Sequence, residues 1–151
     1  MNRDIIKFFR TAAPFLITVV LWRLALPWVN PAGILAIIPV FYCSFVCVKP
    51  YFAPFSVLAC ILLDYSFGTV FIWTICYCLY YAIMNIQTIL DLTHTNKNGL
   101  FAFMLFLGAI IFLIVIQNIN LLNFISGVLT FAVTCALYIP ITKLIQVAGN
   151  D

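Results

Sequence analysis

Charged side chains are almost absent from the long apolar runs of this chain, and this feature limits the folds that the chain can adopt. Only 7% of the 151 residues are charged, whereas 66% are hydrophobic. A soluble domain carries about 25% charged residues, so this composition cannot cover a water-facing surface. The sequence therefore predicts an all-α integral membrane protein with a single helical domain over residues 1–151.

Proline, glycine and polar clusters divide the chain into six apolar segments. We expect helices over about residues 11–28, 32–48, 54–65, 69–90, 99–117 and 122–144. The third run is too short to cross an unthinned bilayer alone, since crossing takes about 20 apolar residues. We therefore expect a compact bundle of six transmembrane segments, in which neighbouring helices shield the short third segment from lipid.

The basic residues predict how these segments are oriented. Six crossings with both termini in the cytoplasm place every Lys and Arg except Arg23 on the inside, as the positive-inside rule requires. The outer connections at 29–31, 65–69 and 118–123 hold no Lys or Arg. If the third run did not cross, Lys97 and Lys143 could not both remain inside with Lys49.

Asp64 and Arg23 are the two charges that lie well inside the apolar runs. Charge at membrane depth is costly, so such residues mark functional or architectural positions. Both are expected near the outer side, Arg23 about a turn and a half before the end of its helix, so we expect them to form an ion pair. Two alternatives remain open: Arg23 extends to the outer headgroups, or Asp64 lies at headgroup depth. Gly68 permits a tight turn after Asp64.

The chain shows no residue pattern typical of an enzyme, a metal site or a nucleic-acid interface. Asp64 is the only embedded acid, so no acid pair is available, and His94 has no obvious triad partners. The six cysteines lie in apolar runs without a C-x-x-C pair, which indicates small buried hydrophobes. We expect no catalytic residue, no metal, no cofactor and no nucleic-acid partner.

Aromatic residues crowd the fourth run, which reads FIWTICYCLYY over residues 71–81. If this run lined a pocket, Trp73, Tyr77 and Tyr80 would be the candidates to stack on a small molecule. A packed or lipid-facing helix surface is the commoner role of such a stretch.

Several short motifs accompany this layout. They are ILLDYSFG at residues 61–68, Pro31 at the start of the second segment, Phe41 or Tyr42 late in it, Ser126 with Gly127 in the last segment, and Pro140 with Lys143 near its end. Together with the length and the six expected segments, they make the chain resemble the MreD family, the rod shape-determining membrane proteins of bacteria. The chain departs from the family in the glycine-poor start of its third segment, PYFAPFSV, and in carrying Arg23.

The resemblance implies a non-enzymatic scaffold of the cell-wall elongation machinery in the bacterial inner membrane. MreC would be its direct partner, and the MreB filament and the peptidoglycan synthases would be indirect ones. Our candidates for architectural or partner-interface residues are Arg23, Pro31, Tyr42, Asp64, Gly68 and Gly127.

The substrate-binding components of energy-coupling-factor vitamin transporters are a second family of similar size and fold. In that case the outer loops and helix ends would close over a vitamin, with Trp73, Tyr77 and Tyr80 against it. The outer connections are very short and hold few polar groups, which argues against this alternative because a binding site needs several placed polar groups.

Overall fold

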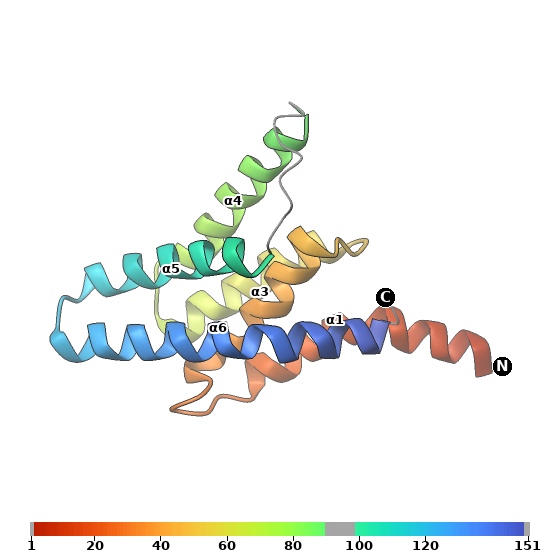
Figure 1. Cartoon of the computed structure of the whole chain (residues 1–151), viewed down its shortest axis with the longest axis horizontal. Coiled ribbons are helices and arrows are strands. Elements are labelled where there is room, and N and C mark those ends of the chain that lie inside the picture. Colours follow the sequence, from red (N-terminus) through yellow and green to blue (C-terminus); the bar gives the residue numbers. More distant parts are fainter. Residues whose placement is uncertain (1, 90–98, 150–151) are drawn as a thin grey trace.

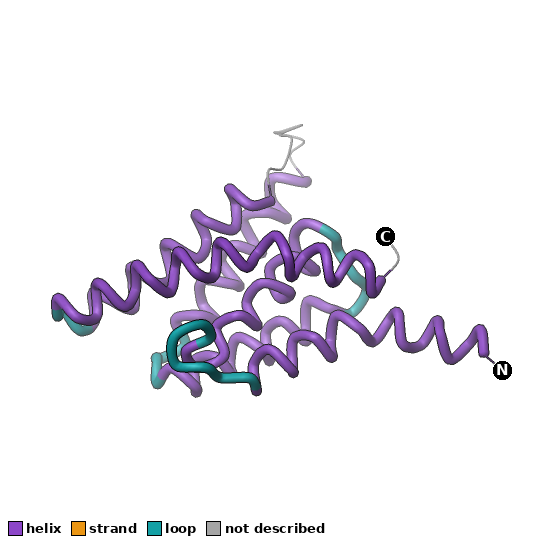
Figure 2. The backbone as a smooth tube through the Cα atoms, turned by 60° about the horizontal axis from the view of Figure 1, so that its bottom comes forward, coloured by secondary structure: helices purple, strands orange, loops and turns teal. Residues whose placement is uncertain are grey.

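The structure, a computed structural model, describes residues 2–89 and 99–149, and the regular elements of these two ranges are all helices (Figure 2). This confirms the predicted all-helical fold. His94 and Lys97 lie outside the described residues. The elements are α1 (Asn2–Arg23), η1 (Pro31–Ala36), α2 (Ile37–Phe41), η2 (Tyr42–Val46), α3 (Phe52–Phe67), α4 (Ile72–Ile89), α5 (Gly99–Gln117) and α6 (Leu121–Gly149).

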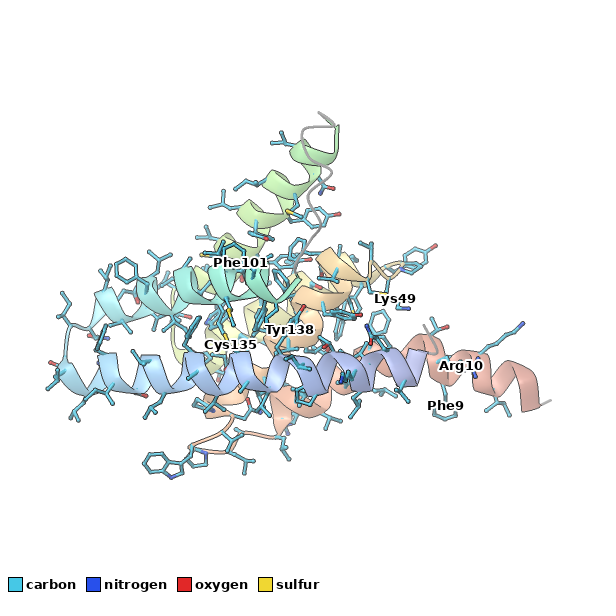
Figure 3. The ribbon with its side chains drawn as sticks, in the orientation of Figure 1. Phe9, Arg10, Lys49, Phe101, Cys135 and Tyr138 are labelled. Carbon is cyan, nitrogen blue, oxygen red and sulfur yellow. The ribbon has the colours of Figure 1, made fainter. Side chains whose placement is uncertain are left out.

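Successive segments run back and forth along the long axis of the molecule (Figure 1). Helices α1, α3 and α5 lead away from the end where the N-terminus lies, and η1–η2, α4 and α6 lead back toward it. The C-terminus lies toward the same end, and so do Arg10 and Lys49 (Figure 3). We call this end the basic end, and we call the end with the connections 24–30, 68–71 and 118–120 the distal end.

Residues 31–46 form the centre of the fold. Every residue from 33 to 45 is buried, and the surrounding helices α1, α3 and α6 all contact this segment. A helix that is covered on all sides is apolar on all sides, which explains its sequence. The prediction placed the shielded segment third rather than second, and α3 instead keeps one face open, with Leu58 60% and Tyr65 85% exposed.

The sequence predicted one regular helix over residues 32–48, and this prediction was wrong in its regularity, because the central segment combines three helix types. It starts as a 3₁₀-helix, with left-handed backbone at Ala32 (φ 52°) and Gly33 (φ 78°). It ends as a π-helix, in which the Cys47 N–H donates to the Tyr42 carbonyl at 2.8 Å. Irregular backbone of this kind is tolerated in an apolar environment where protein covers it.

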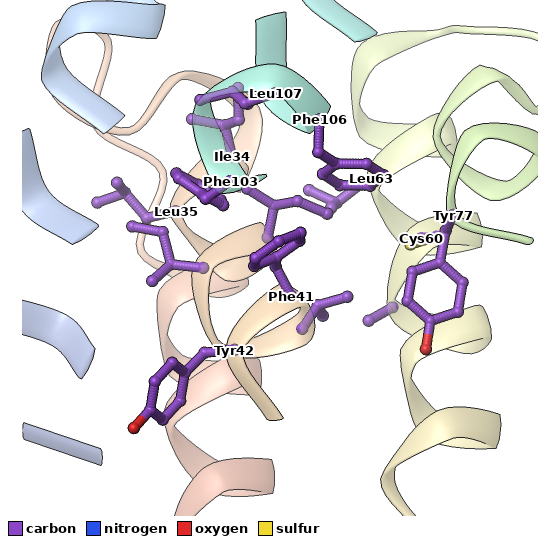
Figure 4. Close-up of a cluster of buried hydrophobic side chains, with 14 of the residues drawn as sticks. Ile34, Leu35, Phe41, Tyr42, Cys60, Leu63, Tyr77, Phe103, Phe106 and Leu107 are labelled. Atoms are coloured by element: carbon purple, nitrogen blue, oxygen red, sulfur yellow. The ribbon is translucent and has the colours of Figure 1, made fainter. Parts of the chain in front are cut away.

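Aromatic packing joins this central segment to the helices around it (Figure 4). The Phe41 ring is at the middle of the cluster, and its side chain is 1% exposed. Its centroid lies 5.1–5.8 Å from the centroids of four rings, those of Phe45, Tyr80, Phe103 and Phe106. The cluster thus connects α2 with α4 and α5.

Helices α5 and α6 are long and apolar enough to cross a membrane, whereas the described helices at 31–46, 52–67 and 72–86 are shorter. The most apolar stretch of α5 has 22% of its residues buried, and that of α6 has 17%. The core helix of a soluble protein would bury its apolar side chains. Both helices instead turn most of their apolar surface outward, which suits a lipid environment.

Helix boundaries follow the predictions unevenly. Helix α5 has the predicted bounds, whereas α1 begins and ends earlier than expected and α6 continues to Gly149. The early end of α1 has a local cause, because Leu26 and Asn30 exchange two backbone hydrogen bonds of 3.0 and 2.9 Å that fold residues 24–30 into a closed turn.

Two glycines with left-handed backbone offer a matched test of the distal turns. A Cβ on Gly33 (φ 78°) would collide with the Trp22 carbonyl, whereas a Cβ on Gly68 (φ 66°) would meet nothing within 4 Å. We expect Gly68→Ala to lower the free energy of unfolding by about 1 kcal/mol, from backbone strain alone. Gly33→Ala should cost about 3 kcal/mol or more, because steric overlap adds to the strain. Unfolding by SDS in detergent micelles, followed by circular dichroism, measures both, and equal losses would contradict the packing at Gly33.

Candidate functional site

The carboxylate of Asp64 caps the start of α4, although it belongs to α3. One oxygen accepts from the Thr69 hydroxyl at 2.7 Å and the Trp73 N–H at 3.0 Å. The other accepts from the Thr74 N–H at 3.0 Å and the Thr74 hydroxyl at 2.7 Å. Asp64 is only 3% exposed, so these groups take the place of water around the charge.

The position of the carboxylate explains how a buried charge is tolerated here. The first N–H groups of a helix have no partner within the helix, and the helix dipole favours a negative charge beside them. Hydrogen bonds to an ionised acceptor are stronger than neutral ones. Asp64 therefore supplies α4 with a capping anion from the preceding helix.

The backbone of the same turn is fitted to this role. Gly68 ends α3 in a left-handed conformation (φ 66°), and the Thr69 N–H donates to the Asp64 carbonyl at 2.9 Å. Asp64 thus closes the junction between α3 and α4 with both its main chain and its side chain. The prediction that Gly68 permits a tight turn here agrees with this geometry.

Arg23 does not form the predicted ion pair with Asp64. It is the exposed last residue of α1, and its guanidinium carbon lies 5.5 Å from the centroid of the Trp22 ring. Four donors already occupy the four acceptor positions of the Asp64 carboxylate. The distal ends of α1 and α3 are joined instead by Trp22, whose Nε1–H donates to the Ser66 hydroxyl at 3.0 Å.

Asn30 is a second buried capping residue, which the sequence showed only as part of a turn. Its side-chain amide donates to the carbonyls of Leu21 at 2.7 Å and Leu24 at 2.5 Å, while its Oδ1 accepts from the Leu35 N–H at 2.8 Å. One side chain, 1% exposed, thereby joins the end of α1 to the Leu35 N–H within η1. The preference of Asn for helix ends was the available signal.

The other candidate residues lie apart from Asp64 and have separate roles. Pro31 is the first residue of η1. The Tyr42 hydroxyl accepts a hydrogen bond from Gln146 Nε2 at 2.7 Å, and this bond connects the central segment to α6. Gly127 allows α5 and α6 to approach, since a Cβ there would lie 3.0 Å from Val115 and 3.2 Å from Ile111.

Of the three aromatic residues considered for a ligand, Trp73 lies beside a cavity at the distal end. The Tyr77 hydroxyl donates to Ser44 at 2.9 Å, and Tyr80 packs against the rings of Phe41 and Phe45. Trp73 lines a distal cavity of about 260 Å³ between the helix ends, whose other lining residues include Pro31, Phe67, Asn118, Asn123, Ser126 and Thr130. Tyr77 and Tyr80 are not among the residues that line this cavity.

Neither protein-family models, nor curated proteins, nor solved structures match this chain.

Asp64→Asn tests the cap with little change in volume. An amide presents one acceptor oxygen and turns an NH₂ group toward donors, so buried N–H and O–H groups lose their partners. We expect the free energy of unfolding in detergent to fall by about 3 kcal/mol. Tyr65→Phe is the control, because its 85% exposed side chain should leave stability unchanged. If Asp64→Asn were as stable as this control, the cap would not hold the junction together.

Proposed function

We propose that this protein is a non-enzymatic membrane scaffold of the MreD type, a subunit of the bacterial cell-wall elongation machinery that helps determine rod shape. The observation that carries the proposal is the role of the acid and the glycine in ILLDYSFG, the main motif of the resemblance. Asp64 and Gly68 form a saturated structural junction. A carboxylate with all its acceptor positions filled suits architecture better than proton transfer or catalysis.

The arrangement of the segments supports six membrane crossings with both termini in the cytoplasm. Six successive segments alternate in direction, and Arg10, Lys49 and the C-terminus lie toward one end of the molecule (Figures 1 and 3). The distal connections carry no Lys or Arg. An excess of basic residues at one end indicates the cytoplasmic side of a membrane protein, which for this proposal is the bacterial inner membrane.

The distal end offers the surface that we assign to a direct partner of the MreC type. Trp28 and Tyr65 are 86% and 85% exposed there, and Val70 is 75% exposed. Protein interfaces are enriched in aromatic residues, and a few of these residues carry much of the binding energy. The MreB filament and the peptidoglycan synthases would then be reached through that partner.

A substrate-binding component of a vitamin transporter is the alternative, and one observation favours it. The distal cavity lies where such a protein would close over its ligand, and Trp73 lines it. Tyr77 and Tyr80 point elsewhere in the core, so the expected aromatic set is not assembled and the scaffold remains the better-supported function.

Reporter fusions test the six crossings. We expect green fluorescent protein fused after residue 50 or at the C-terminus to fluoresce in a bacterial host, because both positions would be cytoplasmic. Alkaline phosphatase fused after residue 69 or 119 should be active, because both positions would be outside. An inactive phosphatase at residue 69 together with a fluorescent fusion there would contradict the crossing by α3.

Surface variants test the scaffold separately from folding. The tagged protein is extracted from its native membrane with a mild detergent, and co-purified proteins are identified by mass spectrometry. We expect the unmodified chain to recover a bitopic MreC-like protein, and Trp28→Ala with Tyr65→Ala to reduce this recovery at least fivefold at unchanged protein level.

The matched control is Val147→Ala, which removes an equally exposed apolar side chain near the basic end and should keep full recovery. Recovery of a coupling protein with ATPases would replace the scaffold by the transporter alternative. Loss of rod shape in cells carrying the double variant is the expected phenotype, and normal rods with intact co-purification would contradict the proposed interface.

A further inference from the structure

The distal cavity is formed by segments that are far apart in the sequence. Pro31 comes from the start of η1, Phe67 from the end of α3 and Trp73 from the first turn of α4, while the remaining wall is built by the end of α5 and the start of α6. All of these lie at the end opposite the termini (Figure 1). In the six-crossing arrangement this is the level of the outer membrane–water interface, where the ester groups of lipids are found.

The lining of the cavity has two chemically different sides. Two amides and two hydroxyls, from Asn118, Asn123, Ser126 and Thr130, lie near the α5–α6 connection and on the start of α6. The other lining side chains, including those of α5, are aliphatic or aromatic. None of the lining residues is charged. Small-molecule sites commonly combine apolar walls with a few polar groups in this way, and an ion here would lack a countercharge.

One of the lining residues, Trp73, carries an unpaired donor. Among the residues that the structure describes, Trp73 Nε1 is the buried side-chain polar atom without a hydrogen-bond partner. The residue is 0% exposed, and the Phe67 ring lies 5.6 Å from its ring, centroid to centroid. A buried N–H without a partner has lost the hydrogen bond that water would give it, so a ligand acceptor that reached it would recover this loss.

We propose that the distal cavity binds the uncharged, oxygen-bearing part of a mainly apolar molecule. The oxygen would accept from Trp73 Nε1 and from the amides and hydroxyls near the α5–α6 connection and on the start of α6, and the apolar part would rest on the aliphatic wall. Two sources share this chemistry, the ester region of an outer-leaflet glycerolipid and a free neutral small molecule. The site is independent of the scaffold role, which needs no ligand.

Fluorescence quenching tests the lipid source. The full-length chain with Trp22→Phe and Trp28→Phe retains Trp73 as its only tryptophan. It is reconstituted in vesicles of phosphatidylcholine whose acyl chains carry bromine, which quenches tryptophan on contact. Trp73 is shielded from the surrounding lipid by protein, so strong quenching requires a lipid inside the cavity. We expect loss of at least half of the emission.

Two variants that fill the cavity provide the comparison. Ser126→Phe and Thr130→Phe each place a ring in the cavity from successive turns of α6, so that one serves if the other fails to fold. Quenching should fall at least twofold in either variant. Equal quenching in the parent and in a folded filled variant would exclude a lipid in the cavity.

The free-molecule source is tested on the same proteins purified in detergent. The protein is denatured, and neutral compounds released from equal amounts are compared by mass spectrometry. A compound released by the parent near one per chain, and at least fivefold less by Ser126→Phe and by Trp73→Phe, identifies a free ligand. If neither a lipid nor such a compound depends on the cavity, the proposal is overturned.

Discussion

A carboxylate that is withdrawn from solvent must be surrounded by donors, and in this protein three of the four donors come from the first turn of the following helix and one from the connection before it. Asp64 closes the α3–α4 junction because its two oxygens meet two N–H and two O–H groups. Asn30 connects α1 and η1 in a similar way, because its side-chain amide donates to two carbonyls and accepts from one N–H. Helix ends near lipid have little water to satisfy them, so these two buried side chains fix the distal turns, on which the packing of the first four segments depends.

The predictable and the unpredictable parts of this junction differ in physical origin. The cost of burying a charge marked Asp64 as architectural before any geometry was known. The hydrogen-bond partners of Asp64 were predicted wrongly. The sequence shows the opposite charge of Arg23, but it does not show that the backbone N–H groups of Trp73 and Thr74 are close to the carboxylate. Those donors exist only once residues 72–89 have become a helix whose start lies beside Asp64. Asn30 was missed for the same reason, since two of its three partners are main-chain carbonyls of the preceding residues.

The layout of the segments was easier to predict than their depth in the bundle. Apolar runs and polar breaks locate the helices, and α5 has the predicted bounds because its run is uninterrupted from Gly99 to Gln117. The second and third runs are both apolar, so composition does not say which of them is central. Burial decides it: residues 33–45 are covered on all sides, while α3 exposes Leu58 and Tyr65. Coverage is a property of the assembled bundle and has no local signature.

The capped helix ends and the buried central segment together explain why a chain with short connections between its helices can present a defined surface. The distal turns are held by internal hydrogen bonds, so Trp28 and Tyr65 project from backbone that is already ordered. A partner that docks on a preorganised surface avoids the entropic cost of ordering it. Flexible loops of the same composition would lose that advantage and would expose unsatisfied main-chain groups at the edge of the bilayer. The scaffold role that we propose would therefore benefit from a buried acid near the end of α3, because its hydrogen bonds stabilise the shape of the distal surface.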